Sequence, residues 1–317
     1  MGAYTVRRIL QAIPVVFLST IMVFGLLHLL PGDPAIALAG ANGTPASIAA
    51  LRHDMGLDKS LPEQYVIWLG RLLHGNLGNS ALSHVAVSTL LAQRIPATME
   101  LALAAMAFAL VISVTTGVVA AVKQRSVADW IITIFNSLAL AIPGFWLGIL
   151  LILLCSVRFS WLPPGGRVAS WGELGPSIRS LALPTLALAL PLIGTLSRFV
   201  KSAMLEVLYD DYVRTARSKG LASRAVIFGH ALRNALLPVV TVLGLQFGFL
   251  LGGTVIIESV FSWPGLGTLM LDGIGNRDYA IVQAGLLYFG AAFIVLNLLT
   301  DLAYGLLNPR IRLGAGS

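Results

Sequence analysis

The sequence predicts an all-α protein that crosses a membrane several times, and two observations carry this prediction. Of its 317 residues, 57% are hydrophobic and only 11% are charged, with a mean hydropathy of +0.85. Soluble domains carry about 25% charged residues, so this chain could not cover a water-facing surface. A helical span needs roughly 20 apolar residues, and apolar runs of that length recur along the chain.

Six such runs predict six transmembrane helices. Their approximate ranges are 9–30, 98–122, 131–157, 181–200, 237–261 and 281–306. An even number of spans places both termini on one side of the membrane. With the termini inside, thirteen of the 21 Lys and Arg residues fall in cytoplasmic segments. The positive-inside rule therefore predicts cytoplasmic termini.

Three parts follow from this order of spans. Residues 1–93 hold the first span and a long extracytoplasmic segment, and residues 94–306 hold the other five spans with a cytoplasmic loop at 201–236. Residues 307–317 form a cytoplasmic tail.

The extracytoplasmic segment carries the start and stop signals of two helices. Thr44-Pro45 and Gly56 predict the start and the end of the first. The second is predicted from Ser60-Leu61-Pro62 to near Gly75, with an apolar face. That face either packs on the membrane domain or lies at the membrane surface, and a purely structural lid is the alternative.

Prolines and glycines mark the later spans. Pro143-Gly144, Pro184 and Pro191 each remove a helical hydrogen bond, either as packing kinks or as hinges. Gly244, Gly248 and Gly252 recur every four residues. This spacing favours a helix-packing stripe over a substrate contact.

The stretch 212–238 is basic and polar inside an otherwise apolar chain. Asp210-Asp211 and Gly220 predict a short helix over 212–219, and a second helix follows from Ser223 to about Leu236. The first helix is too short to be stable alone in water, so the rest of the chain or a partner must hold it. The residues themselves leave open an ordinary positive-inside loop and a docking site for another protein.

Several motifs closely resemble the permeases of ABC importers. A-R-S-K-G at 216–220 and H-A-L-R-N-A-L-L-P at 230–238 resemble the cytoplasmic coupling loop of that family. L-L-P-G-D-P at 29–34, E-S-V-F-S-W-P-G-L-G at 258–267 and N-P-R-I-R at 308–312 resemble its dipeptide, oligopeptide and nickel branch. The chain departs from the family twice: Arg214-Thr215-Ala216 replaces a Glu-Ala-Ala run, and Asn308 replaces a common Asp.

The resemblance implies a type I ABC importer permease fold and one half of a translocation pathway in the bacterial plasma (inner) membrane. A second homologous permease would complete a heterodimer, two ABC ATPase subunits would sit at the cytoplasmic face, and an extracytoplasmic solute-binding protein would deliver cargo. The expected cargo is a di- or oligopeptide, with nickel or glutathione as alternatives. ATP and Mg would sit on the ATPase subunits, so the chain itself is expected to bind no cofactor, metal or nucleic acid.

The residues also indicate that the chain is not an enzyme. A phosphate loop needs Gly-Lys-Ser/Thr, but the lysines followed by serine, Lys59 and Lys201, are preceded by Asp58 and Val200. Neither H-E-x-x-H nor G-x-S-G occurs, and no catalytic residue is expected. A secondary transporter or channel that works alone is the rival class, but its inverted repeats and midplane charges are not evident.

Two sets of site residues follow from the resemblance. The expected ATPase-coupling residues are Tyr212, Arg214, Ala216, Arg217, Lys219, Gly220, His230, Arg233, Asn234 and Pro238. The turn after the fifth span carries Glu258, Phe261, Trp263, Pro264 and Gly265, which are expected at the outer mouth in contact with the binding protein. For Glu258, a structural hydrogen bond to the turn is the alternative.

Overall fold

Helices make up nearly all the regular structure of the chain. The computed structural model describes residues 2–29, 33–39, 43–168 and 174–307. Within these ranges the only β-type pairing is an isolated bridge between Asn79 and Ala86. The N-P-R-I-R motif at 308–312 and residues 30–32 of the motif at 29–34 lie outside the described residues.

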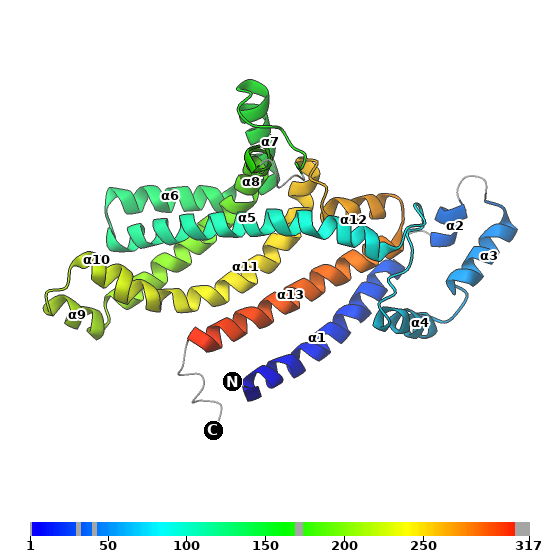
Figure 1. Cartoon of the computed structure of the whole chain (residues 1–317), viewed down its shortest axis with the longest axis horizontal. Coiled ribbons are helices and arrows are strands. Elements are labelled where there is room, and N and C mark those ends of the chain that lie inside the picture. The colour runs from blue at the N-terminus through cyan, green and yellow to red at the C-terminus, as the bar shows by residue number, and fades with distance from the viewer. Residues whose placement is uncertain (1, 30–32, 40–42, 169–173, 308–317) are drawn as a thin grey trace. The chain divides into compact units, whose positions relative to one another are not determined.

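The helices follow one another as Figure 1 labels them. They are α1 (Gly2–Leu29), α2 (Pro34–Ala39), α3 (Pro45–Met55), α4 (Leu61–Leu73), α5 (Val87–Val122), α6 (Val127–Ala141), α7 (Gly144–Leu151), α8 (Leu174–Leu208), α9 (Asp211–Ser218), α10 (Ser223–Ala225), α11 (Leu232–Val260), α12 (Leu266–Gly275) and α13 (Tyr279–Leu307). Two π-helical segments, η1 (Ile152–Arg158) and η2 (Val226–Ala231), continue α7 and α10.

The chain forms two compact units. Unit 1 consists of Met1–Val6, Met99–Trp263 and Val295–Ser317, and unit 2 consists of Arg7–Thr98 and Pro264–Ile294. Each unit has its own hydrophobic core. The core of unit 1 joins α5, α8, α9, η2 and α11, whereas that of unit 2 joins the start of α5 to α12 and α13.

Five helical segments are long and apolar enough to cross a membrane. They are Arg8–Leu26, Val87–Val122, Gly175–Leu208, Ser223–Val260 and Tyr279–Ala303. A sixth span results only if α6 and the helix Gly144–Arg158 cross together, because this pair is bent by 99°. The described residues therefore give an all-helical fold with five to six candidate spans.

The bend explains why the predicted span 131–157 is not one straight helix. Proline disfavours the helical conformation for the residue before it, and Ile142 is indeed extended, with φ −85° and ψ 120°. Pro143 then caps the start of α7. By contrast, Pro184 and Pro191 lie inside the uninterrupted helix α8.

In unit 2, the predicted helices between α1 and α5 are confirmed. The Thr44 hydroxyl caps α3 by accepting the N–H of Ser47 at 3.2 Å, and Gly56 ends the helix with φ 71°. The ion pair between Arg52 of α3 and Asp33 holds this helix to the segment before α2. Burial alone raises the pKa of the Asp33 carboxyl, but its hydrogen bonds with Arg52 and the Ala35 N–H outweigh burial and lower the pKa.

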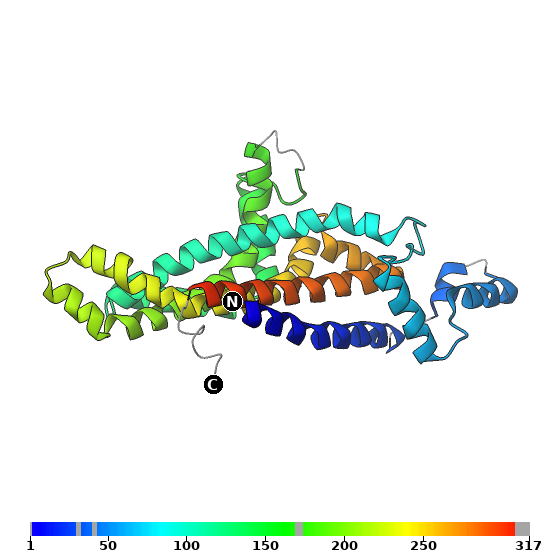
Figure 2. The same ribbon diagram turned by 60° about the horizontal axis from the view of Figure 1, so that its bottom comes forward.

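Helix α4 packs on α1 through aromatic side chains. The Tyr65 and Thr20 hydroxyls are hydrogen-bonded at 2.8 Å. The Phe24 ring lies 5.4 Å from that of Tyr65 and 5.7 Å from that of Trp68, measured between centroids. Figure 2 shows α2 and α3 side by side in the same unit. The face of α4 that was predicted to be apolar is thus partly used within unit 2.

The glycines of the predicted stripe on α11 differ in their contacts. A Cβ at Gly244 would collide with the Thr300 hydroxyl of α13, so glycine permits the close approach of these two helices in unit 1. A Cβ at Gly252 would meet no atom within 4 Å. A packing role for Gly248 and Gly252 stays a prediction.

Candidate functional site

The short helix predicted in the basic loop is present as α9. Its first turn carries Asp211 and its last turn carries Arg217, which suits the helix dipole. Gly220 follows in the left-handed conformation with φ 78°, and its N–H donates to the Arg217 carbonyl at 2.9 Å. Glycine adopts this conformation without the strain that a side chain would bring. The local signals in the sequence therefore set both ends of α9.

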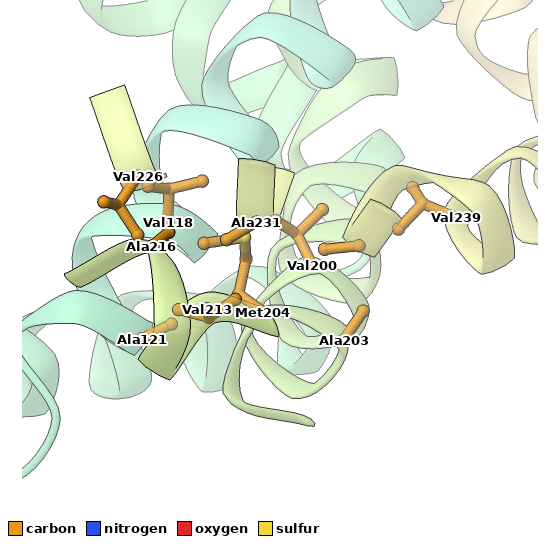
Figure 3. Packing of buried hydrophobic residues seen from close by; sticks show 11 residues of the cluster. Val118, Ala121, Val200, Ala203, Met204, Val213, Ala216, Val226, Ala231 and Val239 are labelled. Atoms are coloured by element: carbon orange, nitrogen blue, oxygen red, sulfur yellow. The ribbon is translucent and has the colours of Figure 1, made fainter. Parts of the chain in front are cut away.

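One face of α9 is buried in the core of unit 1. Val213 has no exposed surface, and Ala216 is also buried. Figure 3 shows both residues in the α9 cluster, which consists of Val118, Ala121, Val200, Ala203, Met204, Val213, Ala216, Val226, Ala231, Ala235 and Val239. Full burial of a valine side chain is worth about 1.5–3 kcal/mol. The chain itself therefore supplies the support that so short a helix needs.

The remaining surface of α9 and its C-terminal end, here called the free face, are exposed and cationic. Arg214, Arg217 and Lys219 are all exposed. The Arg214 side chain is 82% exposed, and its 3.5 Å ion pair with Asp211 is equally open to solvent, so the pair contributes little. Among the described residues, Arg217 and Lys219 have no ion-pair partner. These charges are consequently available to another molecule.

A hydrogen bond also joins α9 to the helix that follows it. The Asn234 amide of α11 donates to the Tyr212 hydroxyl at 2.8 Å. The predicted second helix begins at Ser223 and continues through Pro238 to Val260 as one helical segment. Its π-helical part, η2, buries Val226 and leaves His230 exposed. Such π-helical turns recur at functional sites.

The structure brings the ten predicted coupling residues to this one region but gives them different surroundings. Ala216 faces the chain's own core, and Tyr212 and Asn234 are exposed but contact each other. The other seven are also exposed: Arg214, Arg217, Lys219, Gly220, His230, Arg233 and Pro238.

An ion pair that the sequence did not reveal lies beside the cluster. Lys201 of α8 pairs with Asp129 in the first turn of α6. The Asp129 carboxylate also accepts the N–H of Arg125 at 3.0 Å. Val200, the residue before Lys201, and Ala203, two positions after it, both belong to the α9 cluster. The ion pair therefore ties α6 to the same core. A lone acidic residue at the start of an apolar run is the signal that could have pointed to it.

The turn after α11 is largely inside the protein. Glu258 and Trp263 have no exposed surface, and the Trp263 N–H donates to the Glu258 carbonyl at 2.8 Å. Phe261 and Gly265 are buried and Pro264 is half-buried. Contact of these residues with a binding protein stays a prediction, and for Glu258 and Trp263 it would require a rearrangement that uncovers them.

The described residues contain no group of three or more His, Cys, Asp or Glu side chains that could hold a metal ion.

The fold and the cationic helix α9 define a polytopic membrane protein. Its exposed basic surface lies between two of its candidate spans. The chain belongs to the family of binding-protein-dependent transport system inner membrane components: residues 113–313 match that family, and residues 1–102 match its N-terminal part. It is therefore a multi-pass transport subunit of the inner membrane and not a catalytic one. Systems of this family work with a binding protein and ATPase subunits.

Curated relatives agree over nearly the whole chain. The dipeptide transport system permease protein DppB of Escherichia coli (strain K12) is 41% identical over 336 residues, covering 98% of this chain and 99% of the relative. The glutathione transport system permease protein GsiC of Pectobacterium atrosepticum is 41% identical over 309 residues, covering 98% of each. A probable peptide ABC transporter permease, y4tP of Sinorhizobium fredii, is 39% identical over 312 residues, covering 98% of this chain and all of the relative.

A solved structure shares the fold. A chain of the MetNI methionine ABC transporter, in an inward-facing conformation, superposes with a TM-score of 0.58 and 16% sequence identity. The match covers 70% of this chain and 97% of that chain.

Proposed function

We propose that this chain forms half of the translocation pathway of an ATP-driven peptide importer and that α9 is the surface on which an ATPase subunit docks. One observation carries the docking proposal: α9 is held by its own chain through Val213 and Ala216 while it exposes Arg214 and Arg217. An ordinary positive-inside loop would account for the charges, but not for a buried face that anchors this short helix to the spans.

The proposed topology has six spans and cytoplasmic termini. It requires α6 and the helix Gly144–Arg158 to cross together as one bent span. The excess of Lys and Arg in the segments assigned to the cytoplasm supports this orientation. In it, the coupling loop at 201–236 faces the cytoplasm, the segment between α1 and α5 faces outward, and the parts 1–93, 94–306 and 307–317 keep the roles predicted for them.

Three further kinds of subunit complete the proposed assembly. A second homologous permease pairs with this chain, two ABC ATPase subunits bind ATP and Mg at the cytoplasmic face, and a solute-binding protein delivers cargo from outside. The family's dependence on a binding protein supports this composition.

The α9 cluster gives the coupling a physical basis. ATP-driven closure of the ATPase subunits displaces whatever they grip. Because Val213 and Ala216 pack against residues of α5, α8 and η2, α9 cannot move without these helices. Displacement of α9 is therefore passed to the spans, which shift between two arrangements as alternating access requires.

Peptide is the proposed cargo. Relatives that are about 40% identical over the full chain carry peptide, dipeptide and glutathione in their names. Glutathione is itself an amide-linked chain of amino acids, so an amide-bearing solute is common to these names. Nickel and glutathione remain the alternatives within the family.

Charge reversal on the free face of α9 tests the docking. The double variant Arg214→Glu, Arg217→Glu should assemble with the second permease but lose at least about tenfold in ATP-dependent peptide uptake, because like charges across an interface cost several kcal/mol. Uptake would be measured in proteoliposomes that hold all partner subunits.

The control is Lys123→Glu, which reverses an exposed charge outside α9. Full uptake by the double variant, or an equal loss in Lys123→Glu, would contradict the proposal. Uptake that persists without ATPase subunits would favour a transporter that works alone.

A further inference from the structure

A cavity of about 240 Å³ lies in unit 1 where α7, α8 and α11 meet. Its lining runs from Gly144 on α7 through Ala187–Thr195 on α8 to Gln246–Ile257 on α11. All three helices belong to candidate spans or to the bent pair. The cavity therefore lies among helices that are candidate membrane spans, and none of the α9 cluster residues line it.

Close backbone approach sets the walls of this cavity. A Cβ at Gly144 would come within 3.1 Å of the Ala187 carbonyl oxygen, and one at Gly253 within 3.3 Å of the Leu188 side chain. Contacts this tight leave little room for the helices to collapse into the space. The interruption of the helix at Pro143 also ends α6 next to the cavity.

The lining is almost entirely apolar, with two polar side chains and no ionisable one. The Thr195 hydroxyl already donates to the Pro191 carbonyl at 3.1 Å. The Gln246 carboxamide, by contrast, has no hydrogen-bond partner among the described residues. Polar side chains inside a membrane are costly, and they mark cargo pathways or contacts with other helices.

The polar contact that the cavity offers is therefore the Gln246 carboxamide, which can both donate and accept a hydrogen bond.

We propose that this cavity contacts the backbone amides of the transported peptide and that Gln246 makes the polar contact. The inference rests on the proposed function, since it takes peptide as the cargo. A peptide bond has one donor and one acceptor, which a carboxamide can match at the same time. Charged peptide termini would find no counter-ion here and would be desolvated at a cost. The apolar walls accept many side chains, so the contact recognises the backbone amide of the peptide and tolerates varied peptide sequences.

The test compares Gln246→Leu with the unaltered chain in the fully assembled transporter, using two tripeptides that differ only by N-methylation of an internal amide. Removal of the amide hydrogen should slow uptake by the unaltered chain at least about fivefold beyond any effect in Gln246→Leu, in keeping with one lost hydrogen bond. Because both assemblies use the same binding protein, its own preference for unmethylated peptide cancels in the ratio. Gln246→Leu should also slow uptake of the unmethylated tripeptide, while ATPase stimulation by the binding protein is retained.

Leu245→Ala is the matched control, because Leu245 is exposed on the same helix and does not line the cavity. It should keep the full difference between the two tripeptides. An equal N-methylation penalty in Gln246→Leu and the unaltered chain would overturn the proposal. Loss of the second permease from the purified complex in both Gln246→Leu and Gln246→Asn would also overturn it, because the carboxamide would then be an interface contact. Absence of ATP-dependent uptake of either tripeptide by the unaltered assembly would instead refute peptide transport itself.

Discussion

Helices α9 and α4 are both short helices outside the long spans, and they divide their surfaces in opposite ways. Helix α9 buries aliphatic residues and exposes Arg214 and Arg217. Helix α4 turns Tyr65 and Trp68 toward α1 but leaves Val66 and Leu73 exposed, at 66% and 78%. Each helix depends on its own unit for support, because neither is long enough to be stable alone.

This contrast indicates which kind of surface each helix can contact. Exposed cations on α9 remain well solvated in water and suit a water-soluble partner with acidic groups. Exposed valine and leucine on α4 suit an apolar neighbour, and this favours the membrane surface over a free lid. The lipid contact of α4 stays a prediction.

The largest effect is expected when the buried side of α9 is charged. Val213→Asp places a carboxylate in the α9 cluster without a partner, which should destabilise the protein by about 3–5 kcal/mol. Thermal unfolding of the detergent-purified chain should show a lower Tm, and proteolysis should cut the loop around α9 faster.

Thr215→Asp is the control, since Thr215 lies on the exposed face of the same helix. Its stability should change by no more than about 0.5 kcal/mol. Equal Tm values for the two variants would contradict the burial of Val213.

A larger side chain at Ala216 should have the next largest effect. Ala216→Trp adds volume where α9 meets the α9 cluster, and such overpacking costs about 1–3 kcal/mol. We expect a lower Tm together with loss of uptake, because α9 must shift outward to make room. Lost uptake with an unchanged Tm would show that Ala216 touches the ATPase subunit instead.

The smallest effect is expected at α4. Tyr65→Phe removes the hydrogen bond to Thr20 but keeps the ring contacts with Phe24 and Trp68. One hydrogen bond is worth about 0.5–1.5 kcal/mol, so a small fall in Tm with normal ATPase coupling is predicted. A loss of uptake comparable with that of the α9 charge reversals would show that α4 also takes part in coupling.

Local signals made the ends of the short helices predictable. Thr44 and Gly56 bound α3, and Asp211 and Gly220 bound α9, because capping depends on neighbours within a few residues. The apolar runs likewise predicted where most of the long helices lie.

Contacts between distant residues could not be predicted in this way. The inward face of α9 is decided by packing against Val118 and Val226, and the Asp129–Lys201 pair joins residues 72 positions apart. The break at Pro143 follows from the sequence, but its 99° angle depends on how α6 and α7 each pack on α8. The cavity at Gln246 arises from three helices and has no local signature.

Cross-linking from the free face of α9 would show whether an ATPase subunit docks there. Ser218→Cys introduces an exposed thiol beside Arg217, in a chain whose native Cys155 is replaced by serine. Val66→Cys on α4 is the matched site. In membranes that hold the whole transporter, a short bifunctional reagent should join position 218, and not position 66, to an ATPase subunit. Failure to form that product in a transporter that still takes up peptide, or labelling of position 218 by a membrane-impermeant reagent from outside, would contradict docking of an ATPase subunit on α9.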